Sequence, residues 1–286
     1  MLIPIAYIGV IIIWSTTPLA IKWSSDAGFL FGVTSRMTLG LILCLAIIKL
    51  LKHPLPFHRQ AKVVYVVAGV PLYLGMMSTY WAAQTISSGL IAVLFGLTPI
   101  ATGVFSILIL QQQHFTRMKL MGMLLGVVGL IVVFNRDLSL KLIDSVGVMG
   151  ILFAVLMHSL SAVLVKNENK DLSGLSVASG SLMVATPLFL VTWLIFDGQW
   201  PEFFPLHSQL SIIYLGVSGS VIGFVLYYYL LKHVCASKVG LITLITPIIA
   251  LQIGHQLNNE IIDFQLWLGT VIILSGLLCY QWESFR

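Results

Sequence analysis

Long apolar runs separated by short polar breaks follow one another along the whole chain. Most of these runs have a length of about 20 residues, which is what a helix needs to cross about 30 Å of hydrocarbon. Because no water reaches the bilayer core to satisfy free backbone groups, such runs predict membrane-spanning helices. The ten predicted spans are residues 2–21, 28–49, 63–83, 88–110, 118–134, 146–165, 175–196, 210–231, 239–257 and 264–282. We therefore predict an all-α membrane protein with ten transmembrane helices.

The composition excludes a soluble protein. Of the 286 residues, 58% are hydrophobic and 9% are charged, whereas a soluble domain carries about 25% charged residues. The first run lacks a basic start and a small-residue cleavage site, so we interpret it as a retained helix rather than a signal peptide. The loops are short and leave no room for a separate soluble domain.

The net charge of +5 is spread over these short loops and is a topology signal rather than a nucleic-acid site. With the N-terminus in the cytoplasm, eleven basic residues, among them Lys52 and Arg59, lie inside. Only Lys22, Arg136 and Lys141 then lie outside. The positive-inside rule therefore predicts that both termini are cytoplasmic, in a multi-pass protein of the bacterial inner membrane.

The chain also resembles itself at a shift of about 144 to 148 residues. Thr98-Pro99-Ile100 aligns with Thr246-Pro247-Ile248, Gly75 with Gly223, and Ser15 with Ser159. The two predicted halves are residues 1–141 and 142–286, with five spans each. An odd number of crossings places the halves in opposite senses, so we predict two inverted five-helix repeats.

Inverted repeats favour a transporter. They allow one packing arrangement to open to either side of the membrane when the halves exchange conformations, as alternating access requires. Gene duplication can also simply build a stable bundle, and channels and some membrane enzymes contain repeats. The absence of catalytic motifs adds to the case for transport.

Several loose motifs lie along the chain. Trp14 is followed eight residues later by Lys22, and the fourth and ninth spans carry Pro99 and Pro247. Glu260 stands before the last span. In these features the chain is similar to the drug/metabolite transporter superfamily, in its ten-helix branch with two EamA-type halves. It departs from that pattern at other positions: Ser15 replaces a Gly, Gln113 an acidic residue, Asp263 a Thr, and Lys119 and Leu266 a Gln.

The resemblance implies a secondary carrier of small organic solutes, such as amino acids and drugs, that often works outward. It also implies a central cavity built from spans 1 to 4 and 6 to 9, with spans 5 and 10 at the periphery.

Arg36 is the strongest candidate for substrate binding. It lies about eight residues into the second span, where an unpaired guanidinium costs at least about 2.5 kcal/mol. Gly32 and Gly40 lie four residues to either side on the same face, so backbone or a solute can approach closely. We interpret Arg36 as an anchor for a carboxylate or similar anion. The alternatives are snorkelling to the interface and a structural bond to a helix end.

A polar patch interrupts the first span at Trp14, Ser15, Thr16, Thr17 and Pro18. Proline frees the carbonyl four residues earlier, and interrupted helices at membrane depth usually line a cavity. We predict substrate contacts here and a helix break or gating position at Pro18. The alternative is a packing kink whose hydroxyls bond their own backbone. The prolines of the fourth and ninth spans are predicted breaks or gating positions of the same kind.

Tyr73, Met77, Tyr80 and Gln84 recur at helical spacing on one face of the third span, and Tyr228 is the repeat counterpart of Tyr80. Met and Tyr side chains suit a flat or amphipathic solute, so we predict that this face contacts substrate. Tyr residues at this spacing more often pack or anchor at the membrane interface.

No Asp or Glu lies near the centre of any predicted span, so an embedded carboxylate for proton coupling is missing. His158 is the titratable group that remains near mid-membrane besides Arg36, and an unperturbed His pKa of about 6.5 suits a proton step. A buried His that bonds a helix carbonyl is the more common situation. We include His158 among the substrate-binding candidates.

Enzyme and cofactor motifs are absent from the sequence. It has neither a phosphate-binding Gly loop with Lys nor an HExxH motif. The spacing of Cys44, Cys235 and Cys279 matches neither a zinc site nor a disulfide framework. We therefore expect no catalytic residues, no cofactor and no metal.

A stripe of glycines, Gly122, Gly126 and Gly129, lies in the fifth span, and Gly269 and Gly276 repeat it in the tenth. Such stripes let helices approach closely. We expect each last span to pack onto its own half rather than to form a dimer.

The sequence thus predicts a monomeric exporter of small amphipathic metabolites, amino acids or aromatic solutes, working by alternating access. Its partners are a small-molecule substrate and the lipid bilayer, and no nucleic acid. Two other classes stay open: an intramembrane enzyme acting on lipid-borne substrates, and a non-transporting membrane scaffold.

Overall fold

A computed structural model describes residues 2–111, 116–134, 142–168, 172–223, 226, 229–230, 233–234 and 236–282. All regular structure in these residues is helical. The helices are α1 (Leu2–Ser25), α2 (Phe29–Leu50), α3 (Arg59–Ala82), α4 (Ser88–Phe95), α5 (Thr98–Leu110), α6 (Arg117–Phe134), α7 (Leu142–Glu168), α8 (Gly174–Phe196), α9 (Leu206–Tyr214), the π-helix η1 (Leu215–Ile222), α11 (Ala236–Asn258) and α12 (Phe264–Gln281).

The helices fall where the apolar runs predict them. Seven segments are long and apolar enough to cross a membrane, including Ser88–Leu110, which α4 and α5 share. An all-helical, multi-pass membrane protein is therefore confirmed. The predicted fourth span contains a turn at Gly96 and Leu97, and the predicted eighth span begins as α9 and continues as the π-helix η1.

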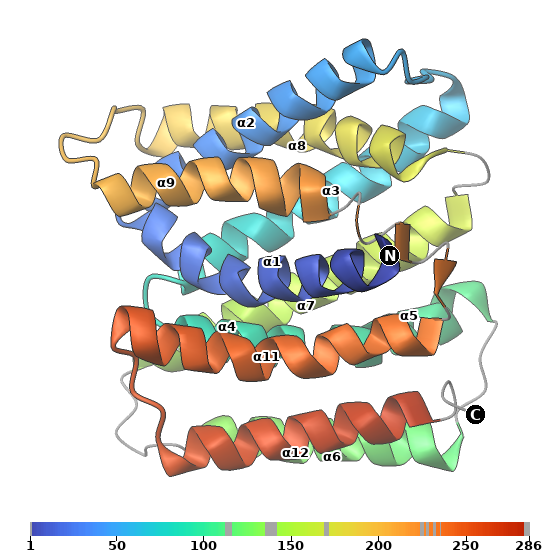
Figure 1. Cartoon of the computed structure of the whole chain (residues 1–286), viewed down its shortest axis with the longest axis vertical. Helices are drawn as coiled ribbons and strands as arrows, with labels where there is room; N and C mark the ends of the chain where they lie inside the picture. Colours follow the sequence, from blue (N-terminus) through green and yellow to red (C-terminus); the bar gives the residue numbers. More distant parts are fainter. Residues whose placement is uncertain are drawn as a thin grey trace.

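The helices lie roughly side by side, with successive spans running in opposite directions (Figure 1). The start of α1 and the end of α12 lie at one end of the bundle, which we call the proximal end. The connections that follow α1, α3, α8 and α11 lie at the other end, the distal end.

Helices from the two predicted halves interleave. Helix α3 packs on α7 and α8, α2 packs on α8 and η1, and α1 packs on α9 and α11. Fully buried residues on these helices include Tyr80, Ile151 and Phe189. The fold therefore places one shared core between the halves.

Helices α6 and α12 pack on each other at one edge of the bundle (Figure 1). A Cβ on Gly122 would lie 2.5 Å from the carbonyl oxygen of Gly276, and a Cβ on Gly276 would lie 2.7 Å from that of Gly122. Our expectation that each glycine stripe packs its helix onto its own half is wrong. The stripes face each other, because two glycine surfaces let the backbones meet.

Two of the three predicted proline breaks are also wrong. Pro18 lies inside the uninterrupted α1, and Pro247 lies inside the uninterrupted α11. Of these three spans, the fourth is interrupted, and there Pro99 occupies the first turn of α5. A gating role for the three prolines stays a prediction. Neighbouring helices support a proline within a span, so its presence alone does not end a helix.

Candidate functional site

Arg36 lies on α2 with only 5% of its surface exposed. Its Nε and Nη1 atoms find no hydrogen-bond acceptor among the described residues. A buried guanidinium without an acceptor is costly, because it loses its hydration without replacing it. The site therefore holds a free, buried positive charge.

The guanidinium faces the π-helix η1. A Cβ placed on Gly219 would lie 3.2 Å from Nη2 of Arg36, and one on Gly40 would lie 3.1 Å from Oγ of Ser220. Ser220 Oγ donates to the carbonyl of Leu215, five residues earlier, at 3.2 Å. Glycines on both helices thus allow the close approach that the sequence predicted around Arg36. The π-helix itself was not predicted, although the small residues of Gly216–Ser220 were a signal, and such segments occur often at functional sites.

His158 lies on α7, where its ring packs against α3 and α4. Its ring meets Phe95 edge to face, with the ring centroids 5.6 Å apart. A Cβ on Gly75 would lie 3.2 Å from Nε2 of His158, and this buried nitrogen has no hydrogen-bond partner in the described part of the chain. The ring is only partly buried. The two candidates thus face different neighbours: η1 for Arg36, and α3 and α4 for His158.

The polar patch of α1 is partly self-satisfied. Thr17 Oγ1 donates to the carbonyl of Ile13 at 2.6 Å, and Thr16 Oγ1 donates to that of Ile12 at 2.7 Å. Both hydroxyls thus bond their own helix, as in the packing alternative, and Thr16 Oγ1 also lies 2.6 Å from the OH of Tyr214 on α9. Ser15 is different: it is 1% exposed, and its Oγ meets no partner among the residues described.

Trp14 extends this patch toward the eighth span. A Cβ on Gly223 would lie 3.9 Å from Nε1 of Trp14, and Gly219, four residues earlier, faces Arg36. Trp14 and Arg36 therefore both lie against the same short stretch of the eighth span.

The predicted Tyr and Met face of the third span is not one open surface. Tyr73 lies against α8, where its OH is 2.6 Å from Oγ1 of Thr192. Tyr80 has no exposed surface, and its OH accepts from Ser24 Oγ at 3.2 Å. Gln84 lies beyond the end of α3 in an exposed turn, so its assignment to the helix face is wrong.

Met77 is partly buried and packs against the core. Tyr228 lies outside the described residues. The role of these two residues in substrate contact stays a prediction, as it does for Tyr73 and Tyr80.

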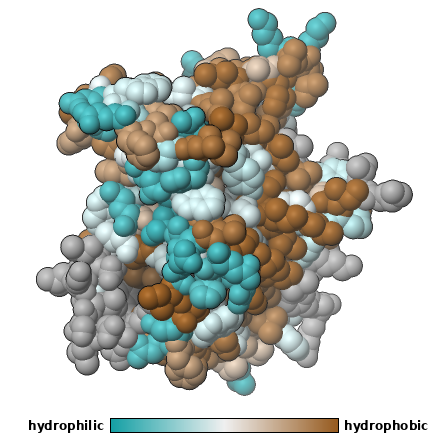
Figure 2. Space-filling model, turned by 60° about the vertical axis from the view of Figure 1, so that its left-hand side comes forward, coloured by the Kyte–Doolittle hydropathy of each residue, from teal (hydrophilic) through white to brown (hydrophobic). Residues whose placement is uncertain are grey.

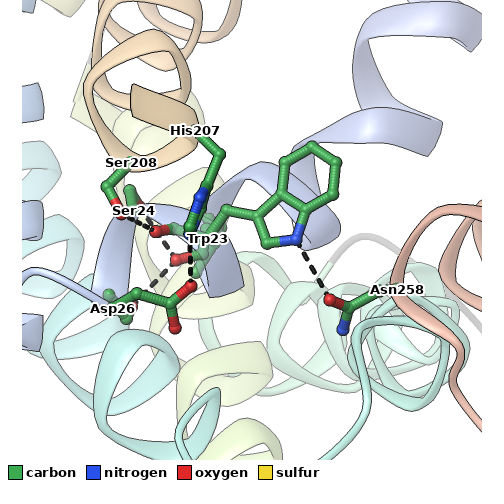
Figure 3. Close-up of polar contacts among 8 residues, drawn as sticks. Trp23, Ser24, Asp26, His207, Ser208 and Asn258 are labelled. Atoms are coloured by element: carbon green, nitrogen blue, oxygen red, sulfur yellow. Dashed lines mark hydrogen bonds and ion pairs between the residues drawn. The ribbon is translucent and has the colours of Figure 1, made fainter. Parts of the chain in front are cut away.

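Polar contacts close the distal end (Figure 3). Trp23 Nε1 donates to Oδ1 of Asn258 at 3.1 Å, and Ser208 Oγ donates to the carbonyl of Trp23 at 2.7 Å. His207 Nε2 lies 2.9 Å from Oδ2 of Asp26. Figure 2, which brings this end forward, shows hydrophilic residues gathered over its middle beside apolar surface. These contacts thus join the end of α1 to the start of α9 and to the end of α11.

The turn between α3 and α4 is held from two sides. Lys22 Nζ donates to the carbonyl of Ile86 at 2.7 Å and lies 3.3 Å from that of Ala83. Glu260 accepts from the backbone N–H of Ser88 at 2.9 Å and from that of Gly89 at 3.2 Å. A lysine thus binds carbonyls at the end of α3, and a carboxylate binds N–H groups at the start of α4. The sequence did not predict these contacts.

A groove of about 440 Å³ lies away from Arg36, at the proximal end of α3. It is lined by Arg59, Lys62, Val63, Val66 and Val67. No group of three or more His, Cys, Asp or Glu residues within the described ranges could hold a metal ion.

Comparison with known proteins gives a consistent picture. The model of the EamA-like transporter family matches residues 1–135 and 145–281. The uncharacterized transporter YoaV of Bacillus subtilis is 24% identical over 273 residues, covering 94% of this chain and 93% of YoaV. An uncharacterized transporter of Buchnera aphidicola is 25% identical and covers 93% of this chain and 89% of its own length.

A solved crystal structure shares the fold at 16% identity, with a TM-score of 0.65. It covers 99% of this chain and 97% of the matched chain. The family match takes in both halves of the helical bundle, as the resemblance to the drug/metabolite transporter superfamily implies. The chain therefore belongs to the EamA-like transporter family.

Proposed function

We propose that this protein is a secondary transporter that exports small organic metabolites carrying an anionic group by alternating access. The observation that carries the proposal is the buried guanidinium of Arg36, whose Nε and Nη1 meet no acceptor among the described residues and which lies against a π-helix. A carboxylate entering there would supply the missing acceptor through charge-assisted hydrogen bonds. Amino acids and aromatic amphipathic solutes are the proposed substrate classes.

The pairing of helices supports two inverted five-helix repeats. Contacts of α3 with α7 and α8 are matched by contacts of the eighth span with α1 and α2. The contact of α5 with α7 is matched by that of α11 with α1. Exchanging the first half for the second converts each of these contacts into its match, as a two-fold axis between the halves requires.

Two hydrogen bonds repeat this exchange at opposite ends of the bundle. Ser208, at the start of the eighth span, donates to the carbonyl of Trp23 at the end of α1. Gln60, at the start of the third span, donates to the carbonyl of Glu168 at the end of α7, at 3.0 Å. One contact is distal and the other proximal, which supports halves of opposite sense.

The proposed orientation places the proximal end, and with it both termini, in the cytoplasm of a bacterial cell. The basic residues Lys52, Arg59 and Lys62 lie at that end, as the positive-inside rule predicts. The protein is proposed to work as a monomer. His158 is the proposed proton-coupling group if a pH gradient drives export.

Transport by the purified protein in vesicles tests the proposal. The panel contains anionic and zwitterionic amino acids and aromatic cations, with and without a pH gradient. We expect Arg36→Ala to lower transport of the accepted anionic solute at least about tenfold, because a hydrogen bond to a charged group contributes about 1.5–3 kcal/mol. Arg36→Lys keeps the charge but lacks the planar guanidinium, so its transport rate should lie between those of the parent protein and Arg36→Ala.

Lys52→Ala is the matched control, since it removes a basic residue from an exposed position at the proximal end. It should transport at the rate of the parent protein. An Arg36→Ala variant that elutes as a folded protein and transports normally would disprove the anchor. A parent protein that moves no solute of the panel would favour the scaffold alternative.

A further inference from the structure

We propose that the carboxylate of Glu260 is a latch that holds the distal end closed during the transport cycle. This inference rests on the proposed function, because a latch has meaning only in a protein that opens. Glu260 touches no proposed substrate group. It acts by holding the start of α4 against the end of α11.

The contacts of Glu260 cross between the two halves of the chain. Oε1 accepts from the backbone N–H of Ser88 at 2.9 Å, and Oε2 accepts from Ser88 Oγ at 3.0 Å and from the N–H of Gly89 at 3.2 Å. The first N–H groups of a helix have no partner within it. A carboxylate there is stabilised by these donors and by the helix dipole.

A second set of bonds ties the same carboxylate to α1. Asn258 Nδ2 donates to Oε1 of Glu260 at 3.0 Å, while Asn258 Oδ1 accepts from Trp23 Nε1 at 3.1 Å. A Cβ on Gly254 would collide with Oε2 of Glu260, so only glycine leaves room for this geometry. One carboxylate thus links the end of α1, the start of α4 and the end of α11.

Buried hydroxyls of α1 and α4 lie at the same end as the network. Ser24 and Ser88 are at most 1% exposed, and Ser24 donates to the OH of the fully buried Tyr80. Glu260 itself is partly exposed. Water can therefore replace its protein partners when the end opens, which makes these bonds reversible rather than permanent.

Asp263, three residues later, offers a direct contrast. Its carboxylate accepts from the N–H of Leu266 at 2.8 Å and so caps α12, the helix that directly follows it. Asp263 and Glu260 both bind a helix start, and the one that Glu260 binds belongs to the first half. In the sequence, the first-half position corresponding to Glu260 is Gln113, a neutral amide outside the described residues.

The test measures how readily reagent reaches a cysteine beneath the network. Ala20→Cys, on α1 and 6% exposed, is introduced into a protein whose native cysteines are replaced by serine. A membrane-impermeant maleimide is then applied separately to intact cells and to inverted vesicles. We expect Glu260→Gln to raise the labelling rate from one side by about tenfold, since each tenfold change in an open-to-closed ratio matches the loss of about one charged hydrogen bond.

Matched variants separate a latch from a structural role. Glu202→Gln, which removes an exposed carboxylate from the connection between α8 and α9 at the same end, should label at the parent rate from both sides. Ser88→Ala, which removes one of the bonds, should raise labelling less than Glu260→Gln does, and Glu260→Asp should restore part of the closed population. Size-exclusion elution and helical circular dichroism identify the variants that fold.

The outcomes distinguish this inference from the proposed function. A folded Glu260→Gln variant that labels at the parent rate overturns the latch, whether or not its transport falls. Equal rises from both sides also overturn it, because they indicate general loosening. A one-sided rise in a protein that moves no panel solute supports the latch and counts against the proposed function.

Discussion

The fourth and ninth spans contain the same tripeptide, Thr98-Pro99-Ile100 and Thr246-Pro247-Ile248, but their backbones differ. The fourth span turns at Gly96 and Leu97 and resumes as α5, whereas α11 continues from Ala236 to Asn258. The residue two positions before the Thr is Gly96 in one span and Leu244 in the other.

The two spans also differ in what surrounds them. Ser159 of α7 donates to the carbonyl of Thr98 at 3.2 Å, and Thr98 Oγ1 donates to that of Phe95 at 2.7 Å. Ser159 thus satisfies a carbonyl at the bend, while its repeat counterpart Ser15 has no partner among the described residues. The comparison teaches that a proline permits a bend, and that glycine and a neighbouring hydroxyl decide whether one forms.

The largest expected effect comes from Gly96→Ala. A Cβ on Gly96 would lie 2.8 Å from the carbonyl oxygen of Val93, which is backbone and cannot move aside cheaply. We expect a loss of about 1–3 kcal/mol in the free energy of unfolding, as for other overpacked sites, measured as a lower Tm in detergent. Gly9→Ala is the control, because its Cβ would meet only the end of the Leu226 side chain. Equal losses for the two variants would contradict this account of the bend.

Ser159→Ala should have an intermediate effect. It leaves the Thr98 carbonyl without its hydroxyl donor, which costs about 1 kcal/mol. Ser15→Ala removes a buried hydroxyl that bonds nothing in the described residues, so its Tm should equal or exceed that of the parent. If the two variants lose the same stability, the hydroxyl contact does not distinguish the spans.

Pro99→Ala should have the smallest effect. Proline in the first turn of a helix forfeits no hydrogen bond, so the free energy of unfolding should stay within about 0.5 kcal/mol of the parent. Pro247→Ala lies in the interior of α11 and restores an N–H there, so its Tm should rise above that of the parent by more than the Tm of Pro99→Ala does. Thermal unfolding of both variants in the same detergent checks the order, and a larger shift for Pro99→Ala would reverse it.

The sequence predicted most of the helical architecture, because hydrophobic length is a local property that needs no knowledge of neighbours. It missed the turn at Gly96 and the π-helix η1 for the opposite reason. Both are small changes of helical winding inside an apolar run. The turn at Gly96 lies between two helices that pack on α7, and η1 packs on α2.

The candidate site divides in the same way. Arg36 could be predicted because a charge inside an apolar run is costly wherever the run packs. Its position against Gly219 depends on how two distant spans meet and could not be predicted. Tyr80 shows the limit of periodicity, which placed it on a helix face but not in the fully enclosed position that it occupies.

The distal network was hidden from the sequence for a further reason. Its bonds join residues far apart along the chain: Ser88 and Glu260 are 172 positions apart, and Trp23 and Asn258 are 235 apart. Glu260 was noticed only as part of a family motif. No local pattern relates it to the start of α4.

The glycine contact between α6 and α12 limits how the bundle can rearrange. Gly122 meets Gly276, and Gly129 meets Gly269, with backbone against backbone. Sliding either helix by one residue would press side chains such as Leu125 or Val133 into the opposite main chain. We therefore expect any rearrangement of the bundle to leave the register between α6 and α12 unchanged.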